Sequence, residues 1–220
     1  MKSPHLKELR RAYGFDEVAI VPGDVTVNPD QTDISFAFGE FKFSIPFLAS
    51  SLDAVASPSF AVCVGEKGGL AVLNLEGIYT RYVDYEEIIR KIIEAPQEQA
   101  TSLLQKVYSS PIKENLLGER TEEIKKAGVT CAVSLTPANA KRLSPIAVEA
   151  GADILVIQST VTTARHKSKS ELGLDLSKIC QQVGIPVIVG NTVTYSAALE
   201  LMGTGVNGVL VGVGPGAICT

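Results

Sequence analysis

The residue best suited by its type and setting to catalytic chemistry is Cys219, which lies in the glycine-rich stretch 212–220, GVGPGAICT. The backbone amides of such a loop can form a nest for a phosphate, and its carbonyls can instead coordinate a hard cation. A cysteine in that setting can act as a nucleophile when its thiolate is favoured. The alternative is a structural glycine turn with an incidental cysteine, and the spacing alone leaves both interpretations open.

The other three cysteines are Cys63, Cys131 and Cys180, and each lies inside an apolar segment. Free cysteines in such segments are usually small core residues, so we expect all three to be buried. The chain has no CxxC pair, which argues against a zinc site. An apolar chain without a signal peptide favours a reducing compartment over a disulfide framework.

Further polar residues gather where short apolar runs end. These positions are Ser50, Ser51, Leu52 and Asp53, then Asn74, then Gln158, Ser159 and Thr160, then Gly190, Asn191 and Thr192, and finally Gly212, Gly214, Gly216 and Cys219. Neutral hydrogen-bonding groups dominate this set. The set therefore favours a site that binds a polar organic ligand through hydrogen bonds. It argues against a glycosidase site, which needs paired carboxylates, and against the site of a metal-dependent hydrolase.

Three charged or titratable residues have weaker claims to a site. Asp53 could simply cap the helix that follows it, and Arg81 could reach a phosphate but is more typical of a solvated side chain. His166 lies in the basic, polar stretch ARHKSKS, which indicates a solvated loop rather than a catalytic base.

The elements that must position these residues follow a repeating rhythm. Six apolar runs, at 45–50, 70–75, 129–135, 152–159, 185–191 and 207–212, alternate with helical patterns. Four of the helices end at Gly128, Gly151, Gly184 and Gly205, where glycine can adopt the left-handed conformation that turns the chain toward the next strand. Strands that are apolar on both faces are typical of a parallel sheet covered by helices. A separate alternating pattern around Gly39 and Glu40 predicts a hairpin.

Serial βα units of this kind form either a (β/α)8 (TIM) barrel or a doubly wound sheet. A doubly wound nucleotide-binding sheet is expected to have a GxGxxG loop after its first strand, and the segment LASSLDAVAS does not match that pattern. We therefore expect a TIM barrel in a single domain over residues 1–220. About the first six strands are present, and the rest of the barrel is absent. Active sites of such barrels lie at the carboxyl ends of the strands.

Composition narrows the class of partner. The chain has 220 residues, a net charge of −4 and 45% hydrophobic residues, which suits a folded domain and argues against nucleic acid as a partner. No apolar run approaches the roughly 20 residues of a membrane helix, and the charged N-terminus does not resemble a signal peptide. We expect a cytoplasmic protein.

Four segments, in order, resemble one family. GVGPGAICT is similar to the active-site loop of the IMP dehydrogenase and GMP reductase family, whose pattern is Gly-x-Gly-Pro-Gly-Ser-x-Cys-Thr. GFDEVAIVPGDVTV followed by IPFLASSLDAV resembles the family's N-terminal signature and first strand loop. AGADILVIQST and IPVIVGNTVT supply the third and fourth matches. Together they extend over almost the whole chain.

The resemblance implies a purine-nucleotide oxidoreductase that oxidises IMP to XMP with NAD, in guanine nucleotide synthesis. It implies that Cys219 is the nucleophile and that Ser50, Leu52, Gly216 and Ala217 bind the substrate. Gln158, Ser159, Asn191 and Gly212 match positions near the nicotinamide end of the cofactor. Gly214, Gly216 and Cys219 match carbonyl ligands of a potassium ion. It also implies a homotetramer.

Departures from the family pattern leave alternatives open. Gln158 stands where most dehydrogenases have aspartate, and Ala217 stands where serine is usual. Only helical patterns lie between the second and third strands, where most dehydrogenases insert a regulatory CBS pair, so we expect no CBS regulation. The family's flap would lie beyond residue 220. The alternatives are a GMP reductase that uses NADPH and a catalytically silent nucleotide-binding homologue.

Overall fold

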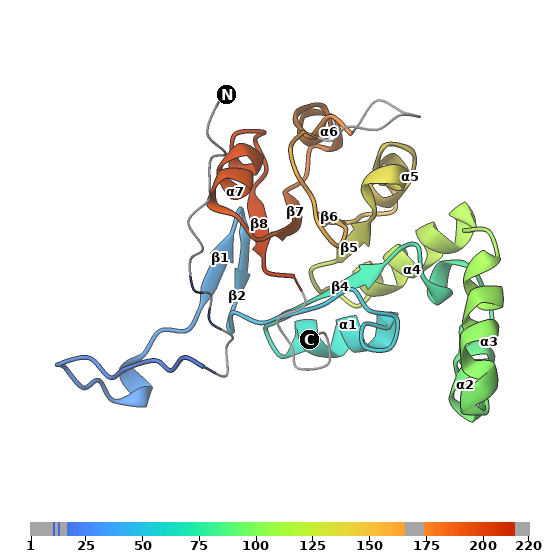
Figure 1. The fold of residues 1–220 in the computed structure, drawn as a ribbon, viewed down its shortest axis with the longest axis horizontal. Helices are drawn as coiled ribbons and strands as arrows, with labels where there is room; N and C mark the ends of the chain where they lie inside the picture. Colours follow the sequence, from blue (N-terminus) through green and yellow to red (C-terminus); the bar gives the residue numbers. More distant parts are fainter. Residues whose placement is uncertain (1–10, 12, 14–16, 166–173, 214–220) are drawn as a thin grey trace, which may run out of the picture. The chain divides into compact units, whose positions relative to one another are not determined.

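The computed structural model describes residues 11, 13, 17–165 and 174–213 (Figure 1). The chain divides into two compact units: Ile34–Val213, and Met1–Asp33 together with Gly214–Thr220. In the described part of the smaller unit, the only regular element is the 3-10 helix η1 (Pro29–Gln31). The larger unit contains the sheet and all the described α-helices.

The larger unit is built on a six-stranded parallel sheet. Its strands are β3 (Leu48–Ala49), β4 (Leu70–Asn74), β5 (Ala132–Leu135), β6 (Ile154–Gln158), β7 (Val187–Thr192) and β8 (Gly208–Val211). Each strand pairs with the next one along the chain, in the order β3-β4-β5-β6-β7-β8. A doubly wound sheet reverses its strand order part-way, so this order excludes that alternative. The fold is a curled half-barrel, consistent with the expected partial TIM barrel.

Helices cover the outer face of the sheet (Figure 1). They are α1 (Pro58–Glu66), α4 (Glu114–Lys126), α5 (Pro137–Glu149), α6 (Leu176–Val183) and α7 (Tyr195–Met202). Their apolar faces bury Leu117, Leu143 and Ile179 against outward-facing strand residues such as Leu73 and Leu155. None of the described helices has both the length and the apolar character that crossing a bilayer requires.

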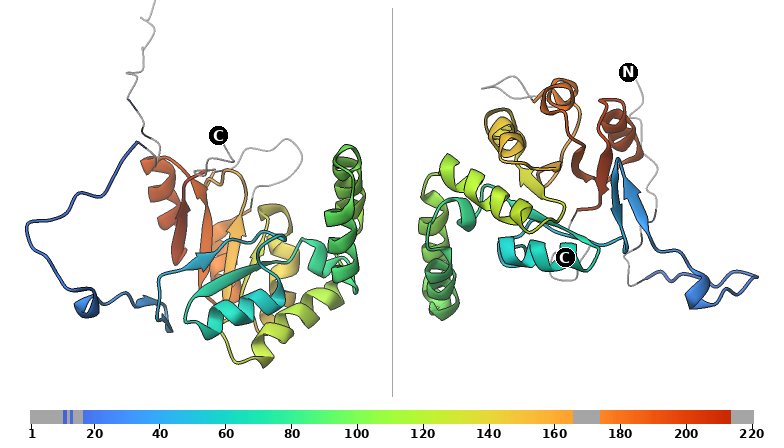
Figure 2. Two further views of the ribbon diagram at one scale, coloured as in Figure 1. Left: turned by 90° about the horizontal axis from the view of Figure 1, so that it is seen from below. Right: turned by 180° about the vertical axis from the view of Figure 1, so that it is seen from behind.

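A helical hairpin interrupts the βα rhythm between β4 and α4. After the short 3-10 helix η2 (Ile78–Thr80) it consists of α2 (Tyr85–Glu94) and α3 (Gln97–Ser109), which project away from the sheet (Figures 1 and 2). No residue of α2 is fully buried, and Val107 is the only buried residue of α3. The expected helical patterns are therefore confirmed in this interval.

The inner face of the sheet has its own apolar layer. Strand alternation places Leu70, Val72, Ile154 and Val156 on this face, and Phe43 packs against them. Phe43 belongs to the predicted hairpin, formed by β1 (Phe36–Phe38) and β2 (Phe41–Phe43). Because the hairpin packs where the strands begin, it covers the amino ends of the sheet and leaves the carboxyl ends for a site.

One expectation about the cysteines is only partly right. Cys131, just before β5, is fully buried, and burial raises the pKa of its thiol to about 12. Cys180 is half-buried, but Cys63 is exposed. The prediction for Cys63 was wrong because α1 turns Ala61 toward the sheet, and helical periodicity then places Cys63 on the solvent side.

Two glycines with open space around them allow a test of backbone conformation alone. Gly118 lies inside α4 and Gly184 ends α6 with φ +65°; an added Cβ would meet no atom within 4 Å at either position. We expect Gly118→Ala to stabilise the protein by about 0.5–1 kcal/mol, because alanine favours the helix. We expect Gly184→Ala to destabilise it by about 1 kcal/mol, because alanine is strained at positive φ. Urea unfolding of both variants measures the contrast, and equal shifts would contradict it.

Candidate active site

Three polar side chains meet at the carboxyl ends of the strands. The Ser51 hydroxyl, just after β3, donates to Oε1 of Gln158 at 3.1 Å, and Nε2 of Gln158 donates to Oδ1 of Asn191 at 3.3 Å. Gln158 ends β6, and Asn191 lies near the end of β7. The structure thus brings together two predicted site residues, Gln158 and Asn191, with Ser51 as their neighbour.

The Ser51–Gln158 hydrogen bond also shows that the sheet is curved. Two strands, β4 and β5, separate β3 from β6. Strands in a flat sheet lie about 4.8 Å apart, so three spacings would separate β3 and β6 by about 14 Å. A side-chain hydrogen bond of 3.1 Å between these segments requires the sheet to curl inward at this end.

Ser159 follows directly but serves its own turn. Its hydroxyl donates to the Val161 carbonyl at 2.8 Å and lies 2.9 Å from the Thr162 hydroxyl. The Thr162 hydroxyl in turn donates to the Gly190 carbonyl at 2.6 Å. These bonds fix the start of the loop after β6 against β7, so the Ser159 side chain helps to shape the edge of the site. Nearby, the hydroxyl of Thr192 is buried and has no hydrogen-bond partner in the described part of the chain.

The loop after β3 presents two predicted substrate residues to solvent. Ser50 is exposed, and 59% of Leu52 is exposed. The Leu52 carbonyl accepts hydrogen bonds from the amides of Val55 and Ala56, both at 2.8 Å, which closes a tight turn. The backbone is therefore ordered while the two side chains stay available to a ligand.

Asp53, the next residue, has a different role from the expected one. Ser57 caps α1, accepting from the Phe60 amide at 3.0 Å. Asp53 instead accepts hydrogen bonds from three segments that lie later in the chain. The donors are Nδ2 of Asn74 at 3.0 Å, the Ile78 amide at 2.7 Å and the Tyr108 hydroxyl at 2.7 Å. The expectation of a helix cap is therefore wrong, and the carboxylate links the β3 loop to β4, η2 and α3.

Two further charged residues near β4 hold the scaffold together. Glu76 accepts from the Thr136 amide and, at 2.6 Å, from Nδ2 of Asn139, so its carboxylate lies at the N-terminus of α5. Arg81 is half-buried and donates to the backbone carbonyls of Glu76 and Ser110. Arg81 is therefore bound to the backbone rather than being a fully solvated side chain, and two of its N–H groups are already used. Sequence analysis missed Glu76 because its partners lie 60 residues away along the chain.

Two tyrosines near Asp53 should keep their protons to high pH. Burial, reinforced by the Asp53 charge, raises the pKa of Tyr79 to about 12, and burial with the Asp53 hydrogen bond raises the pKa of Tyr108. A pKa raised by folding contributes stability that is full below the unfolded value of about 10 and is lost as pH rises through the folded value. We therefore expect stability to fall above pH 10.

The near-ultraviolet absorbance of tyrosinate checks this expectation. In the folded protein, part of the tyrosinate signal should appear only near pH 12, and Tyr79→Phe should reduce that late fraction. In denaturant, all the tyrosines should titrate together. A native titration curve that coincides with the denatured curve would contradict the prediction.

The remaining predicted site residues fall mostly outside the described residues. These are Cys219, Gly214, Gly216 and Ala217, so the roles of the nucleophile and the potassium ligands stay predictions. His166 also lies outside the described residues, and its role stays a prediction too. Gly212 is described: its φ is +112°, and its amide donates to the Thr192 carbonyl at 2.8 Å. Glycine is required at this conformation, which directs the chain out of β8. Among the described residues, no group of three or more histidine, cysteine, aspartate or glutamate side chains could hold a metal ion.

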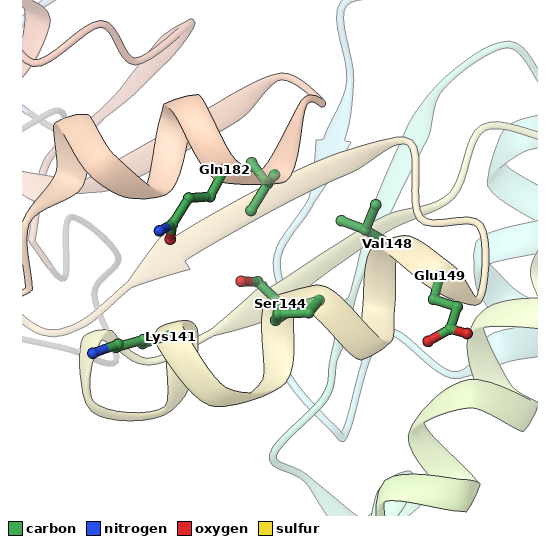
Figure 3. A pocket seen from close by; sticks show the side chains of 7 residues that line it. Lys141, Ser144, Val148, Glu149 and Gln182 are labelled. Carbon is green, nitrogen blue, oxygen red and sulfur yellow. The ribbon is translucent and has the colours of Figure 1, made fainter.

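A shallow groove lies elsewhere, on the helical layer between α5 and α6 (Figure 3). Its volume is about 280 Å³, and its lining includes Lys141, Ser144, Val148, Glu149 and Gln182. No predicted site residue lines it. The groove lies on the outer face of the half-barrel, away from the Ser51–Gln158–Asn191 group.

Comparison with known proteins identifies the family. Residues 12–220 match the family model described as IMP dehydrogenase / GMP reductase domain. A protein named as an uncharacterized oxidoreductase of Mycolicibacterium smegmatis is 38% identical over 210 residues, which are 93% of this chain and 56% of that protein. Inosine-5'-monophosphate dehydrogenase of Cryptosporidium parvum is 27% identical over 233 residues, covering 97% of this chain and 54% of the relative.

A solved structure agrees. The crystal structure of an IMP dehydrogenase/GMP reductase-like protein from Corynebacterium glutamicum superposes with a TM-score of 0.88 at 36% identity, covering 94% of this chain and 56% of that one. The chain thus spans about half the length of the relatives that it matches. The family model matches nearly the whole chain, and the solved structure shares its fold. The chain therefore belongs to the IMP dehydrogenase / GMP reductase domain family.

Proposed function

We propose that this chain forms the first part of the catalytic barrel of an NAD-dependent IMP dehydrogenase, which oxidises IMP to XMP. The observation that supports this most directly is the hydrogen-bonded group of Ser51, Gln158 and Asn191, which lies next to the exposed Ser50 and Leu52. Barrel enzymes bind their substrates at this end of the sheet. Membership of the family supports a nucleotide as the class of substrate.

In the proposed reaction, the thiolate of Cys219 adds to C2 of IMP. The C2 hydrogen then leaves with its electron pair, and a thioimidate between Cys219 and the base remains. Water attacks this thioimidate, releasing XMP and restoring the thiol. Splitting the oxidation into two steps lowers the barrier of each one. In this scheme Leu52 packs on the base, while Ser50 and the backbone of Gly216 and Ala217 bind the phosphate.

NAD, when bound, accepts the hydride. The chemistry of the described residues fits its nicotinamide end, whose carboxamide needs neutral donors and acceptors. Gln158 and Asn191 offer side-chain amides, and the buried Thr192 hydroxyl has no partner in the described part of the chain. The Ser51 hydroxyl fixes the orientation of the Gln158 amide. Ser159 and Gly212 act through the backbone shape of the same edge.

A potassium ion is also part of the proposal. Its ligands would be the carbonyls of Gly214, Gly216 and Cys219, because hard cations prefer oxygen ligands. The interval between β4 and α4 contains the α2–α3 hairpin, and we propose that the protein has no CBS regulation. We propose that the protein assembles as a homotetramer, which light scattering after size exclusion would test.

The full-length protein should be assayed with IMP, NAD and potassium, following NADH absorbance. Turnover that depends on IMP supports the proposal. A parallel assay with GMP and NADPH tests the GMP reductase alternative, and turnover of GMP alone would replace the proposed activity. Binding of IMP by calorimetry without turnover in either assay would indicate a silent nucleotide-binding homologue.

A further inference from the structure

The base of the α2–α3 hairpin is hydrogen-bonded to the residues that directly follow η2. The Tyr82 hydroxyl donates to the Val107 carbonyl at 3.0 Å and lies 2.7 Å from the Ser110 hydroxyl. Arg81 donates to the Ser110 carbonyl. These contacts fix the last turn of α3 next to η2, while the far end of the hairpin extends away from the sheet (Figure 2).

From this fixed turn, Tyr108 reaches the β3 loop. Its hydroxyl donates to Oδ2 of Asp53 at 2.7 Å, across 55 residues of sequence. The Arg81 guanidinium lies over the Tyr108 ring, 5.9 Å from its centroid, and further restricts the ring. A hydrogen bond to a carboxylate is among the stronger hydrogen bonds in proteins. This side-chain hydrogen bond joins α3 to the β3 loop.

Asp53 passes this restraint to the substrate residues. It directly follows Leu52, whose carbonyl accepts the Val55 and Ala56 amides. The backbone carbonyl of Asp53 also accepts from the Tyr79 hydroxyl at 2.9 Å. The loop that presents Ser50 and Leu52 is therefore tied at Asp53 to a helix that itself contributes no predicted site residue.

We infer that Tyr108 is a positioning residue, which preorganises the Ser50–Leu52 loop for the nucleotide through its hydrogen bond to Asp53. The inference rests on the proposed function, in which Ser50 and Leu52 contact IMP. Preorganisation lowers the entropy cost of binding, so the loss of this bond should weaken substrate binding more than it slows the chemistry. The α2–α3 hairpin thereby gains an indirect role in substrate affinity, through Asp53.

The test compares two hydroxyl deletions in the full-length protein. Tyr108→Phe removes the bond to Asp53. Tyr85→Phe, on α2 of the same hairpin, is the matched control: it removes a hydroxyl that is not among the donors to Asp53, and it keeps the ring that packs edge-on against Tyr79 with centroids 4.9 Å apart. We expect Tyr108→Phe to raise KM for IMP about three- to tenfold with kcat within about twofold, a split that indicates lost uniform binding. Tyr85→Phe should leave both constants unchanged.

Hydrogen exchange provides a readout that needs no substrate. In Tyr108→Phe the amides of Val55 and Ala56 should exchange about tenfold faster, and in Tyr85→Phe at the wild-type rate. In an Asp53→Ala background, which removes the acceptor, Tyr108→Phe should have little further effect, because the bond between the two side chains is already lost. Unchanged exchange in Tyr108→Phe, or equal effects of the two tyrosine changes, would overturn the inference. If the wild type turns over no IMP, the proposed function is wrong, and the exchange comparison still decides whether Tyr108 holds the loop.

Discussion

Cys219→Ala should lower kcat for IMP oxidation by about a thousandfold or more, while IMP still binds. The reason is chemical: alanine has no nucleophile to form the covalent thioimidate, and loss of a covalent catalyst removes transition-state stabilisation that other residues do not replace. NADH production from the full-length variant measures the effect, and calorimetry measures the retained affinity. Residual activity within tenfold of the wild type would show that Cys219 is not the nucleophile.

Thiol alkylation gives a second measure of Cys219, but the exposed Cys63 complicates it. The experiment therefore needs a Cys63→Ala background, in which Cys131 is shielded by complete burial. We expect an alkylating agent at neutral pH to modify Cys219 first, activity to fall in step, and prior IMP to protect the thiol. Faster modification of Cys180, or no protection by IMP, would contradict the catalytic assignment.

Gly77→Ala should disrupt the Asp53 group. Gly77 is buried just before η2, and a Cβ there would overlap the carboxylate oxygens of Asp53. To relieve the overlap, Asp53 must move and lose its bonds to Asn74, the Ile78 amide and Tyr108. We expect the free energy of unfolding to fall by about 2–4 kcal/mol, because a partly buried carboxylate loses several partners together. KM for IMP should also rise.

Gly118→Ala is the control for this substitution, since it adds the same methyl group where no atom lies within 4 Å. Urea unfolding gives the free energies of both variants. The φ of Gly77 is −93°, so alanine has no intrinsic backbone strain there and the expected loss comes from the collision alone. A Gly77→Ala protein as stable as the wild type would mean that the carboxylate is not held as the structure describes.

The barrel architecture was predictable from the amino-acid sequence, because it follows from local patterns. Apolar runs that suit a two-sided buried strand, and glycines that end helices at positive φ, recur in each βα unit. Gly128, Gly151, Gly184 and Gly205 all adopt positive φ as predicted. The positions of Gln158 and Asn191 at strand ends followed from the same rhythm, since parallel strands bring their carboxyl ends to one edge.

Which of these residues come into contact depends on how the whole chain packs in three dimensions. Ser51 reaches Gln158 because the sheet curls, and curvature is a property of the whole sheet rather than of any segment. Asp53 could not be distinguished from a helix cap in sequence, because its partner Tyr108 lies 55 residues away on an inserted helix. The prediction that Cys63 is buried was wrong for a related reason. An apolar segment indicates that one side of a helix is buried, but packing against the sheet decides which residues lie on that side.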